Sequence, residues 1–378
     1  MPFAAALSEH PLATAATGEI LGEVVERLGE RPDFAVLFAS ASHVGALDDV
    51  AATVQTVLDP TAFVGATAGA VLAGDHGVED APALALFAAR LPGRIVPVHL
   101  TAEATTDGWQ LDGLPALDHG AAGSLVLLAD PFSFPVSALL ADLAEAAADL
   151  SVIGGLASAA RGPGGNRLVV GGRVTAAGAV GLLLDRDAAP EAVVSQGCRP
   201  IGTPFTVTRS ERHVIYELAG RPALERLMEL IGGLDPEERR LASSGLHCGI
   251  VVDEHKLDFQ RGDFLIRGVL GADREVGAIA VGDEVPVGAT VQFQVRDAST
   301  AGEDLDAVLG DRQAEGSLVF TCNGRGAQMF GDPHHDAAIV HGRLGGAVAG
   351  MFCAGEVGPV AGSNALHGFT ASVALFRD

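Results

Sequence analysis

The fold is decided by the stretch SLVFTCNGRG at residues 317–326 and by the two segments after it, VAGMFCAGEVGPVAGSN (348–364) and LHGFTASVALF (366–376). An apolar run ends in a polar loop, an amphipathic segment follows, and a Gly/Ala-rich turn separates two further strand-like runs. The same order begins at DFAVLFASASH (33–43) and again at SLVLLADPFSF (124–134). This periodicity predicts one βαββ unit used three times.

Each copy contains one segment with helical spacing of its apolar residues. These segments are predicted as helices over Leu47–Leu58, Val136–Leu150 and His335–Leu344. Asp332 is predicted to cap the third helix, with Pro333 at its first position, where a missing N–H costs nothing.

Between the second and third copies the sequence changes character. Residues 195–208 are rich in Gly, Pro and Thr and are predicted as a crossing segment. Strand-like runs then follow at Gly249–Val252, Phe264–Val269, Ala278–Val281 and Thr290–Arg296, with turn residues between them. The predicted fold class is therefore α/β: repeated βαββ units forming mixed sheets flanked by helices, with an inserted antiparallel β portion in the C-terminal half.

The composition narrows the range of partners and compartments. Of the 378 residues 48% are hydrophobic and the net charge is −24, so an ordered core is expected and nucleic acid or anionic lipid is not an expected partner. No apolar run is long enough to cross a membrane, and no export signal is visible at the N-terminus. The four cysteines are widely spaced and form no C-x-x-C, which favours a reduced, cytoplasmic location over a disulfide framework or zinc site.

Several motifs together resemble the FIST-domain proteins. They are QGCRPIG (196–202), VIYELAGRPALERL (214–227), FTCNGRG (320–326), FCAGEVGPV (352–360) and LHGFTASVALF (366–376), with FASASH (38–43) and VGATAGAVLAG (64–74) in the first half. The resemblance implies a FIST N-terminal-like domain over residues 1–205 and a FIST C-terminal-like domain over 206–378. It further implies a free-standing bacterial sensory module that binds a small ligand, with a signalling partner protein and a homodimer as further expectations.

The loop Cys322–Gly326 is the first candidate for ligand binding. Its glycines allow backbone N–H groups to turn inward, and Arg325 offers a planar fork for a carboxylate or phosphate. Cys322, Asn323 and Arg325 are therefore candidate ligand-binding residues. A tight turn with an exposed arginine is the structural alternative.

The turn Cys353–Glu356 is the second candidate. The corresponding turns of the first two copies carry neither an acid nor a thiol. Glu356 could accept a ligand's amine or hydroxyl, or orient Arg325. A small buried Cys353 and a surface turn acid at Glu356 are the alternatives.

Four further residues complete the predicted ligand pocket, which is expected to form from the loops Ala39–His43, Cys198–Ile201 and Asn364–His367 with the two above. They are His43, Arg199, Asn364 and His367. A purely structural hydrogen bond is the alternative for His367. No metal site is predicted, because no two-histidine motif has helical spacing.

The leading hypothesis is a sensor of a small anionic or zwitterionic metabolite, such as an amino acid, without catalysis. A haem-binding nitric-oxide sensor is the second hypothesis and follows only from the resemblance; the cofactor itself stays unknown. A thiol-dependent hydrolase would pair Cys322 or Cys353 with His367 and Glu356. A protein-recruiting scaffold is the last alternative.

Overall fold

The computed structural model describes residues 2–106, 108–116, 122–256 and 258–377. The chain divides into two compact units. The first, here called the three-sheet unit, comprises Met1–Ser195, Leu305–Pro359 and Ser363–Asp378. The second, the barrel unit, comprises Gln196–Asp304 with Val360–Gly362. The α/β fold class with mixed sheets, flanking helices and an antiparallel β portion is confirmed.

The first copy of the sequence pattern forms a compact pairing of three strands. Strand β2 pairs parallel with β3 and antiparallel with β6, and helix α2 connects β2 to β3. The bounds are β2 Phe34–Ser40, α2 Leu47–Leu58, β3 Ala62–Ala68 and β6 Leu84–Ala89. All three strands are buried throughout, as their nearly continuous apolar sequence requires.

The second and third copies have the same pairing. Strand β9 is parallel to β10 and antiparallel to β13, while β23 is parallel to β24 and antiparallel to β27. The bounds are β9 Ala122–Ala129, α3 Val136–Ala146, β10 Ser151–Leu156, β13 Ala179–Asp185, β23 Gly316–Cys322, α8 His335–Leu344, β24 Ala347–Cys353 and β27 Thr370–Phe376.

The Gly/Ala turn of each copy opens into a hairpin that leaves its own sheet. The first copy's hairpin pairs with β24 of the third copy, the second copy's with β3 of the first, and the third copy's with β10 of the second. These hairpins are β4 Ala70–Ala73 with β5 His76–Glu79, β11 Leu168–Val170 with β12 Arg173–Thr175, and β25 Glu356–Val360 with β26 Ser363–His367. The exchange runs in a cycle through all three copies.

The other edge of each sheet is completed by β1 in the first sheet, by β7 and β8 in the second and by β14 in the third. The sheet orders are β1-β6-β2-β3-β11-β12, β26-β25-β10-β9-β13-β7-β8 and β14-β27-β23-β24-β4-β5. The remaining elements of this unit are β1 Phe3–Ser8, α1 Ala13–Leu28, η1 Ala41–Ala46, β7 Ile95–Thr105, β8 Gly108–Asp112, η2 Arg186–Ala188, β14 Glu191–Gln196, α6 Ala298–Leu309 and α7 Ala327–Phe330, of which β14 and α6 run across its limits.

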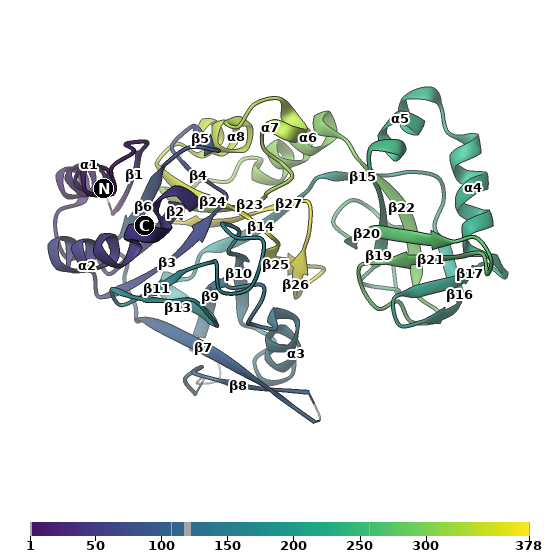
Figure 1. Ribbon diagram of the computed structural model, residues 1–378, viewed down its shortest axis with the longest axis horizontal. Coiled ribbons are helices and arrows are strands. Elements are labelled where there is room, and N and C mark those ends of the chain that lie inside the picture. The colour runs from purple at the N-terminus through teal and green to yellow at the C-terminus, as the bar shows by residue number, and fades with distance from the viewer. Residues whose placement is uncertain (1, 107, 117–121, 257, 378) are drawn as a thin grey trace. The chain divides into compact units, whose positions relative to one another are not determined.

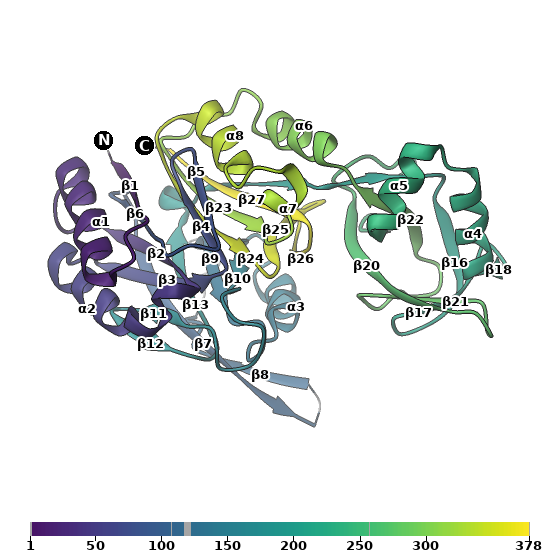
Figure 2. The same cartoon turned by 45° about the horizontal axis from the view of Figure 1, so that its top comes forward.

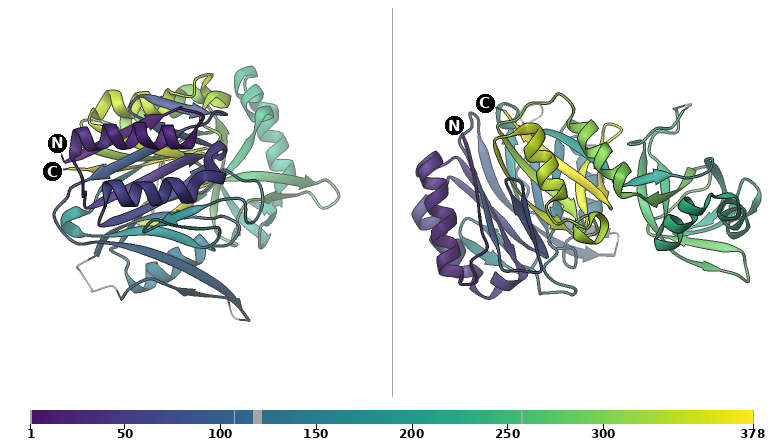
Figure 3. Two further views of the ribbon diagram at one scale, coloured as in Figure 1. Left: turned by 60° about the vertical axis from the view of Figure 1, so that its left-hand side comes forward. Right: turned by 90° about the horizontal axis from the view of Figure 1, so that it is seen from above.

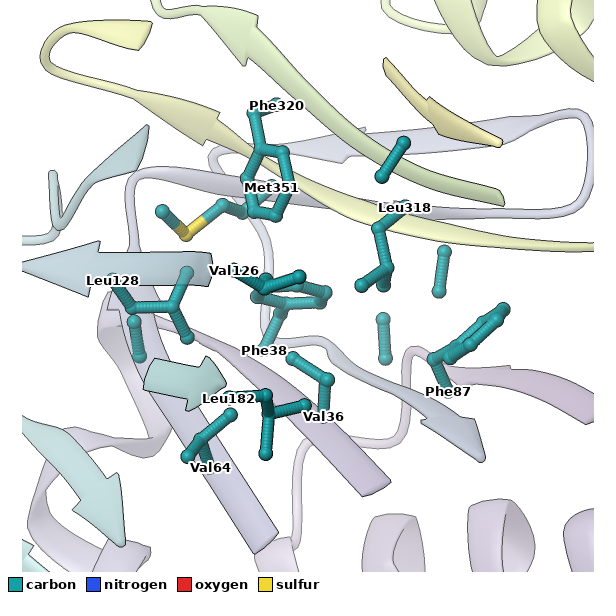
Figure 4. Packing of buried hydrophobic residues seen from close by; sticks show 14 of the residues in the cluster. Val36, Phe38, Val64, Phe87, Val126, Leu128, Leu182, Leu318, Phe320 and Met351 are labelled. Carbon is teal, nitrogen blue, oxygen red and sulfur yellow. The ribbon is translucent and has the colours of Figure 1, made fainter. Parts of the chain in front are cut away.

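The inner faces of the three sheets share one apolar core. Figure 4 shows side chains from all three sheets meeting there, among them Phe38, Leu128 and Phe320 at corresponding strand positions. Helices cover the outer faces: α1 and α2 lie on the first sheet, α3 on the second, and α6 with α8 on the third (Figures 2 and 3). Burial on both faces is the main stabilising contribution of these strands.

The barrel unit contains a closed antiparallel sheet. Its strands follow the order β22-β16-β17-β21-β20-β19, and β19 returns to pair with β22 (green in Figure 1). The bounds are β15 Cys198–Pro200, β16 Phe205–Glu211, β17 Val214–Leu218, β18 Arg221–Pro222, α4 Ala223–Gly233, α5 Pro236–Ser244, β19 Leu246–Val251, β20 Phe264–Asp273, β21 Ala278–Val281 and β22 Thr290–Arg296. The predicted crossing segment contains β15 and the beginning of β16, so it is part of this sheet.

Two details of the predicted helices differ in the structure. Helix α3 ends at Ala146 and not at Leu150. Helix α8 has the predicted bounds, but His334 is its N-cap, and Asp332 accepts a hydrogen bond from the His334 N–H (2.8 Å) before the helix begins. Pro333 therefore precedes the cap, which corrects its predicted position. Among the described residues no helix has the length and apolarity to span a membrane.

A glycine at the same register position brings the two parallel strands of each copy together. A Cβ at Gly350 would stand 2.0 Å from the Val319 carbonyl oxygen, and Gly65 and Gly154 approach Leu37 and Leu127 in the same way. The neighbour is backbone, so it cannot move aside without parting the strands. We expect Gly350→Ala to lower the free energy of unfolding by about 3 kcal/mol in urea titrations.

Helix α8 offers the matched control for this substitution. A Cβ at Gly342 would meet nothing within 4 Å. Gly342→Ala is therefore expected to raise stability by about 1 kcal/mol, because alanine favours the helix. Equal effects of the two substitutions would contradict the proposed close approach.

Candidate functional site

Two strand ends of the third copy bring the predicted cysteines together. Cys322 and Cys353 are the last residues of β23 and β24 and are register partners. The Asn323 N–H continues the pairing by donating to the Cys353 carbonyl (2.9 Å). The turn that follows folds back tightly, since the Arg325 N–H donates to the Cys322 carbonyl (2.8 Å). The sequence thus places both loops at the carboxyl end of one parallel pair.

The next glycine is needed for contact with the hairpin from the first copy. A Cβ at Gly326 would stand 1.7 Å from Oε1 of Glu79. That oxygen instead accepts a hydrogen bond from the Ala327 N–H (2.8 Å) at the start of α7. On the same hairpin, the Gly77 N–H donates to Nδ1 of His334 (3.0 Å). The exchanged hairpin therefore holds the loop that carries Arg325.

Arg325 is fully buried and forms a bidentate ion pair with Asp336. Its Nε and Nη2 donate to the two carboxylate oxygens at 2.7 and 2.9 Å. Burial opposes the charge of Asp336, but Arg325, His335 and Thr321 outweigh it and hold the pKa of that carboxyl well below its ordinary value. The expectation of an exposed arginine is wrong, and so is that of a whole fork free for a ligand. Of the three guanidinium nitrogens of Arg325, Nη1 is the one that has no hydrogen-bond partner within the described part of the chain.

Aromatic rings hold this ion pair in place. The His335 ring stacks on Phe330 at a centroid distance of 3.5 Å, and its Nδ1 lies 2.9 Å from Oδ1 of Asp336. The Arg325 guanidinium carbon lies 5.3 Å from the centre of the Phe330 ring. With little freedom to reorient, the guanidinium keeps Nη1 in a fixed direction.

Glu356 is the second buried charged group, and it begins β25. Its Oε2 accepts hydrogen bonds from the Thr370 N–H (3.1 Å) and hydroxyl (2.9 Å). Burial raises the pKa of this carboxyl to about 8, although Thr370, Arg325 and Cys322 each act to lower it. Oε1 accepts no hydrogen bond of good geometry from any residue the structure describes. Glu356 is therefore not a surface turn acid.

The two thiols differ in exposure. Cys353 is fully buried in the common core, and burial, then Glu356 and Cys322, raise the pKa of its thiol well above the ordinary value. Cys322 is half-buried and is the member of the cluster that solvent reaches. Cys322, Cys353, Arg325 and Glu356 thus form one group of side chains, here called the third-repeat cluster. Asn323 lies exposed beside it.

The other predicted ligand residues have different surroundings. Asn364 bridges backbone groups at the start of β10, accepting from the Val152 N–H (2.9 Å) and donating to the carbonyl of Leu150, the residue before the strand (2.7 Å). Nε2 of His367 lies 3.0 Å from the Gly358 carbonyl oxygen. Both contacts are structural in character, and the His367 contact occupies one of its two ring nitrogens.

The described contacts of His43 and Arg199 are with other residues. His43 is buried in η1, and burial lowers the pKa of its imidazole. Arg199 belongs to the barrel unit, where its guanidinium forms ion pairs with Glu238 (3.0 Å) and Asp297 (3.1 Å). No group of three or more His, Cys, Asp or Glu side chains suited to a metal ion occurs in the described ranges.

Sequence reasoning missed Asp336, Thr321, Thr370 and Glu79. Asp336 has the sequence signal of an ordinary acidic residue in the first turn of a helix. Thr321 precedes Cys322 in the strand and donates its hydroxyl to Asp336 (2.5 Å). The one available signal was polarity in an apolar strand, since the corresponding positions of the first two copies are Ala39 and Ala129.

Comparison with known proteins identifies both halves of the chain. The model of the FIST N domain matches residues 33–221, and that of the FIST C domain matches residues 223–359. The predicted limit between residues 205 and 206 stays a prediction, since neither these matches nor the compact units coincide with it.

Full-length relatives occur in mycobacteria. The chain is 45% identical to the uncharacterized protein Rv0628c of Mycobacterium tuberculosis over the whole of both chains. It is 44% identical to the uncharacterized protein Mb0898c of Mycobacterium bovis over 97% of each. The predicted resemblance is confirmed: the chain belongs to the FIST family, whose domains are sensory modules of signal transduction.

Proposed function

We propose that the chain is a sensor that binds a small zwitterionic metabolite with an amino-acid-like head group at the third-repeat cluster. The observation that supports this most is a pair of buried, unpartnered polar atoms of opposite character, Nη1 of Arg325 and Oε1 of Glu356. Buried polar atoms normally have a partner. Arg325 also acts on the pKa of Glu356, which puts the two groups within electrostatic range.

The two atoms suit the two ends of a zwitterion. Nη1 donates to a carboxylate oxygen, while Glu356 accepts from an ammonium group. Asp336 already neutralises most of the guanidinium charge, so a ligand carboxylate would gain one charge-assisted hydrogen bond and not a bidentate pair. A ligand with both groups is therefore favoured over a simple anion.

Entry of a ligand requires movement of the loop after β23. Arg325, Cys353 and Glu356 are fully buried, whereas Asn323 on the loop and Ala327 and Gln328 at the start of α7 are exposed. The contacts of Glu79 and His334 fasten this loop to the hairpin from the first copy. Binding would loosen or shift that attachment, which gives the sensor a conformational output.

The pH dependence of binding tests the role of Glu356. At pH 6 the Glu356 carboxyl is protonated, because burial raises its pKa to about 8. An ammonium group binds the ionised form, so ligand affinity should rise about tenfold per pH unit between pH 6 and 8. We expect this rise in thermal-shift titrations of the full chain with a panel of L-amino acids, with glycine betaine, which has no N–H, as the comparison.

Two variants make the test specific. Glu356→Gln should abolish both the binding and its pH dependence, while Asp130→Asn, the same change at a buried carboxyl of the second copy, should retain them. Unchanged stabilisation of Glu356→Gln at both pH values would refute the proposed site. An absorbance scan of protein from haem-supplemented cells tests the haem alternative, which predicts a Soret band.

A further inference from the structure

Two of the chain's four cysteines lie side by side on adjacent strands. Cys322 and Cys353 are register partners in the parallel pair β23–β24. Because side chains alternate along a strand, both thiols lie on the face that carries Phe320 and Met351, the face of the common core. Adjacent strands are about 4.8 Å apart, inside the Cα separation of roughly 4.4–6.8 Å that a disulfide spans.

We propose that Cys322 and Cys353 form a reversible disulfide when the protein meets hydrogen peroxide, so that the third-repeat cluster is also a redox-modification site. The chemistry needs no bound metabolite and stands independently of the proposed sensor function. Disulfides in reducing compartments are typically transient and serve redox sensing.

The two thiols have different roles because they differ in exposure. Cys322 is half-buried, so peroxide can reach it, and it lies within electrostatic range of the Arg325 guanidinium. Cys353 is fully buried and is reached only through its neighbour. Cys322 is therefore the thiol that peroxide attacks, and Cys353 is the resolving thiol.

The reaction has two steps. The Cys322 thiolate attacks one oxygen of hydrogen peroxide, the O–O bond breaks, and a sulfenic acid forms while the released hydroxide takes the thiol proton as water. The Cys353 sulfur then attacks the Cys322 sulfur, an S–S bond forms and the S–O bond breaks. Glu356 relays the Cys353 proton to the departing hydroxide, which gives a second water. Two thiols and one peroxide thus yield one disulfide and two waters.

The Cys353 sulfur packs closely against the neighbouring strand β10. Gly155 of β10 faces it, and a Cβ there would stand 2.2 Å from the Cys353 sulfur. The sulfur fills the space that a side chain at residue 155 would take, so disulfide formation requires a rotation about Cα–Cβ that turns it from Gly155 toward Cys322.

The other copies provide tolerated replacements at both positions. Ser40 and Ala68 are the corresponding register partners in the first copy. Cys322→Ser and Cys353→Ala therefore introduce residues that the same fold already holds at these places. Cys198 and Cys248 are both buried in the barrel unit, and burial raises the pKa of Cys248 to about 12. Replacing these two by alanine leaves the proposed pair as the only thiols.

Intact-mass spectrometry of the full chain tests the proposal. In the Cys198→Ala/Cys248→Ala background, graded hydrogen peroxide should remove the mass of two hydrogen atoms without adding oxygen, and dithiothreitol should reverse the change. With Cys353→Ala added, Cys322 should gain one oxygen that dimedone traps. With Cys322→Ser added, the same peroxide should cause no mass change.

Two results would overturn the proposal. One is addition of oxygen to the Cys198→Ala/Cys248→Ala protein while its Cys353 can still be alkylated after denaturation. The other is no change of mass at peroxide levels that oxidise the Cys353→Ala protein. If the added substitutions prevent folding, peptide mapping of the oxidised Cys198→Ala/Cys248→Ala protein decides alone. It shows whether a disulfide joins the peptide that contains Cys322 to the peptide that contains Cys353. Loss of metabolite binding alone would leave these mass measurements unaffected.

Discussion

At pH 8 the Glu356→Gln variant is expected to be more stable than the wild-type protein, by as much as about 5 kcal/mol, since each unit of pKa shift corresponds to 1.36 kcal/mol. Burial raises the pKa of Glu356 from 4.5 to about 8. The folded protein therefore binds more protons than the unfolded chain between these pH values. The stability that the neutral Glu356 carboxyl contributes is fully present below pH 4.5 and is lost as the pH rises toward 8. Glutamine has no such titration and can still accept the hydrogen bonds of Thr370.

Urea unfolding from pH 4.5 to 9 measures this difference. The two proteins should have similar stability near pH 4.5 and diverge above it. Subtracting the two curves removes the contribution of other shifted groups such as His247, where burial lowers the pKa to about 4. Glu26→Gln on α1, whose side chain is exposed, controls for the amide substitution itself. Parallel curves for wild type and Glu356→Gln would show that the Glu356 carboxyl ionises normally.

Arg325→Met is expected to lower the free energy of unfolding by about 3–5 kcal/mol, because it leaves a buried carboxylate without its counter-ion. Asp336 is almost fully buried, and its two carboxylate oxygens accept hydrogen bonds from Nε and Nη2 of Arg325. Asp336→Leu should have a comparable effect for the converse reason. Methionine preserves much of the arginine volume, so that lost packing contributes little.

The double variant separates charge from packing. Arg325→Met with Asp336→Leu removes both charges, and apolar replacement of a buried ion pair is often neutral. We therefore expect it to regain most of the lost stability in a double-mutant cycle. The exposed pair Arg186–Asp149 is the control, and its removal should cost less than about 1 kcal/mol. Additive losses in the buried cycle would mean that the two charges do not stabilise each other.

Local sequence patterns were sufficient to predict many of the elements. Helices α2 and α8 and strands β21 and β22 have the bounds predicted from spacing and turn residues. The hairpins between the Gly/Ala turns and the following strands were missed, because each is short and pairs with a strand distant in sequence. Pairing partners depend on the whole arrangement of the sheets and leave no local signal.

The same distinction explains the site. Polar residues within apolar repeats were a sound signal for Cys322, Cys353, Arg325 and Glu356, which the structure brings together. The burial and the partners of these side chains were not predictable from the sequence, since the ion pair of Arg325 with Asp336 and the burial of Glu356 both depend on loop packing. Asn364 and His367 had the same polar signal and make backbone contacts instead.

The exchanged hairpins constrain how this architecture can change in length. Removing any one copy would leave two unpaired strand edges, one on the sheet that its hairpin completes and one on the hairpin that it receives. Such edges promote aggregation. A shortened descendant with a single copy could restore the cycle only as a trimer in which the hairpin of each chain pairs with the sheet of the next chain.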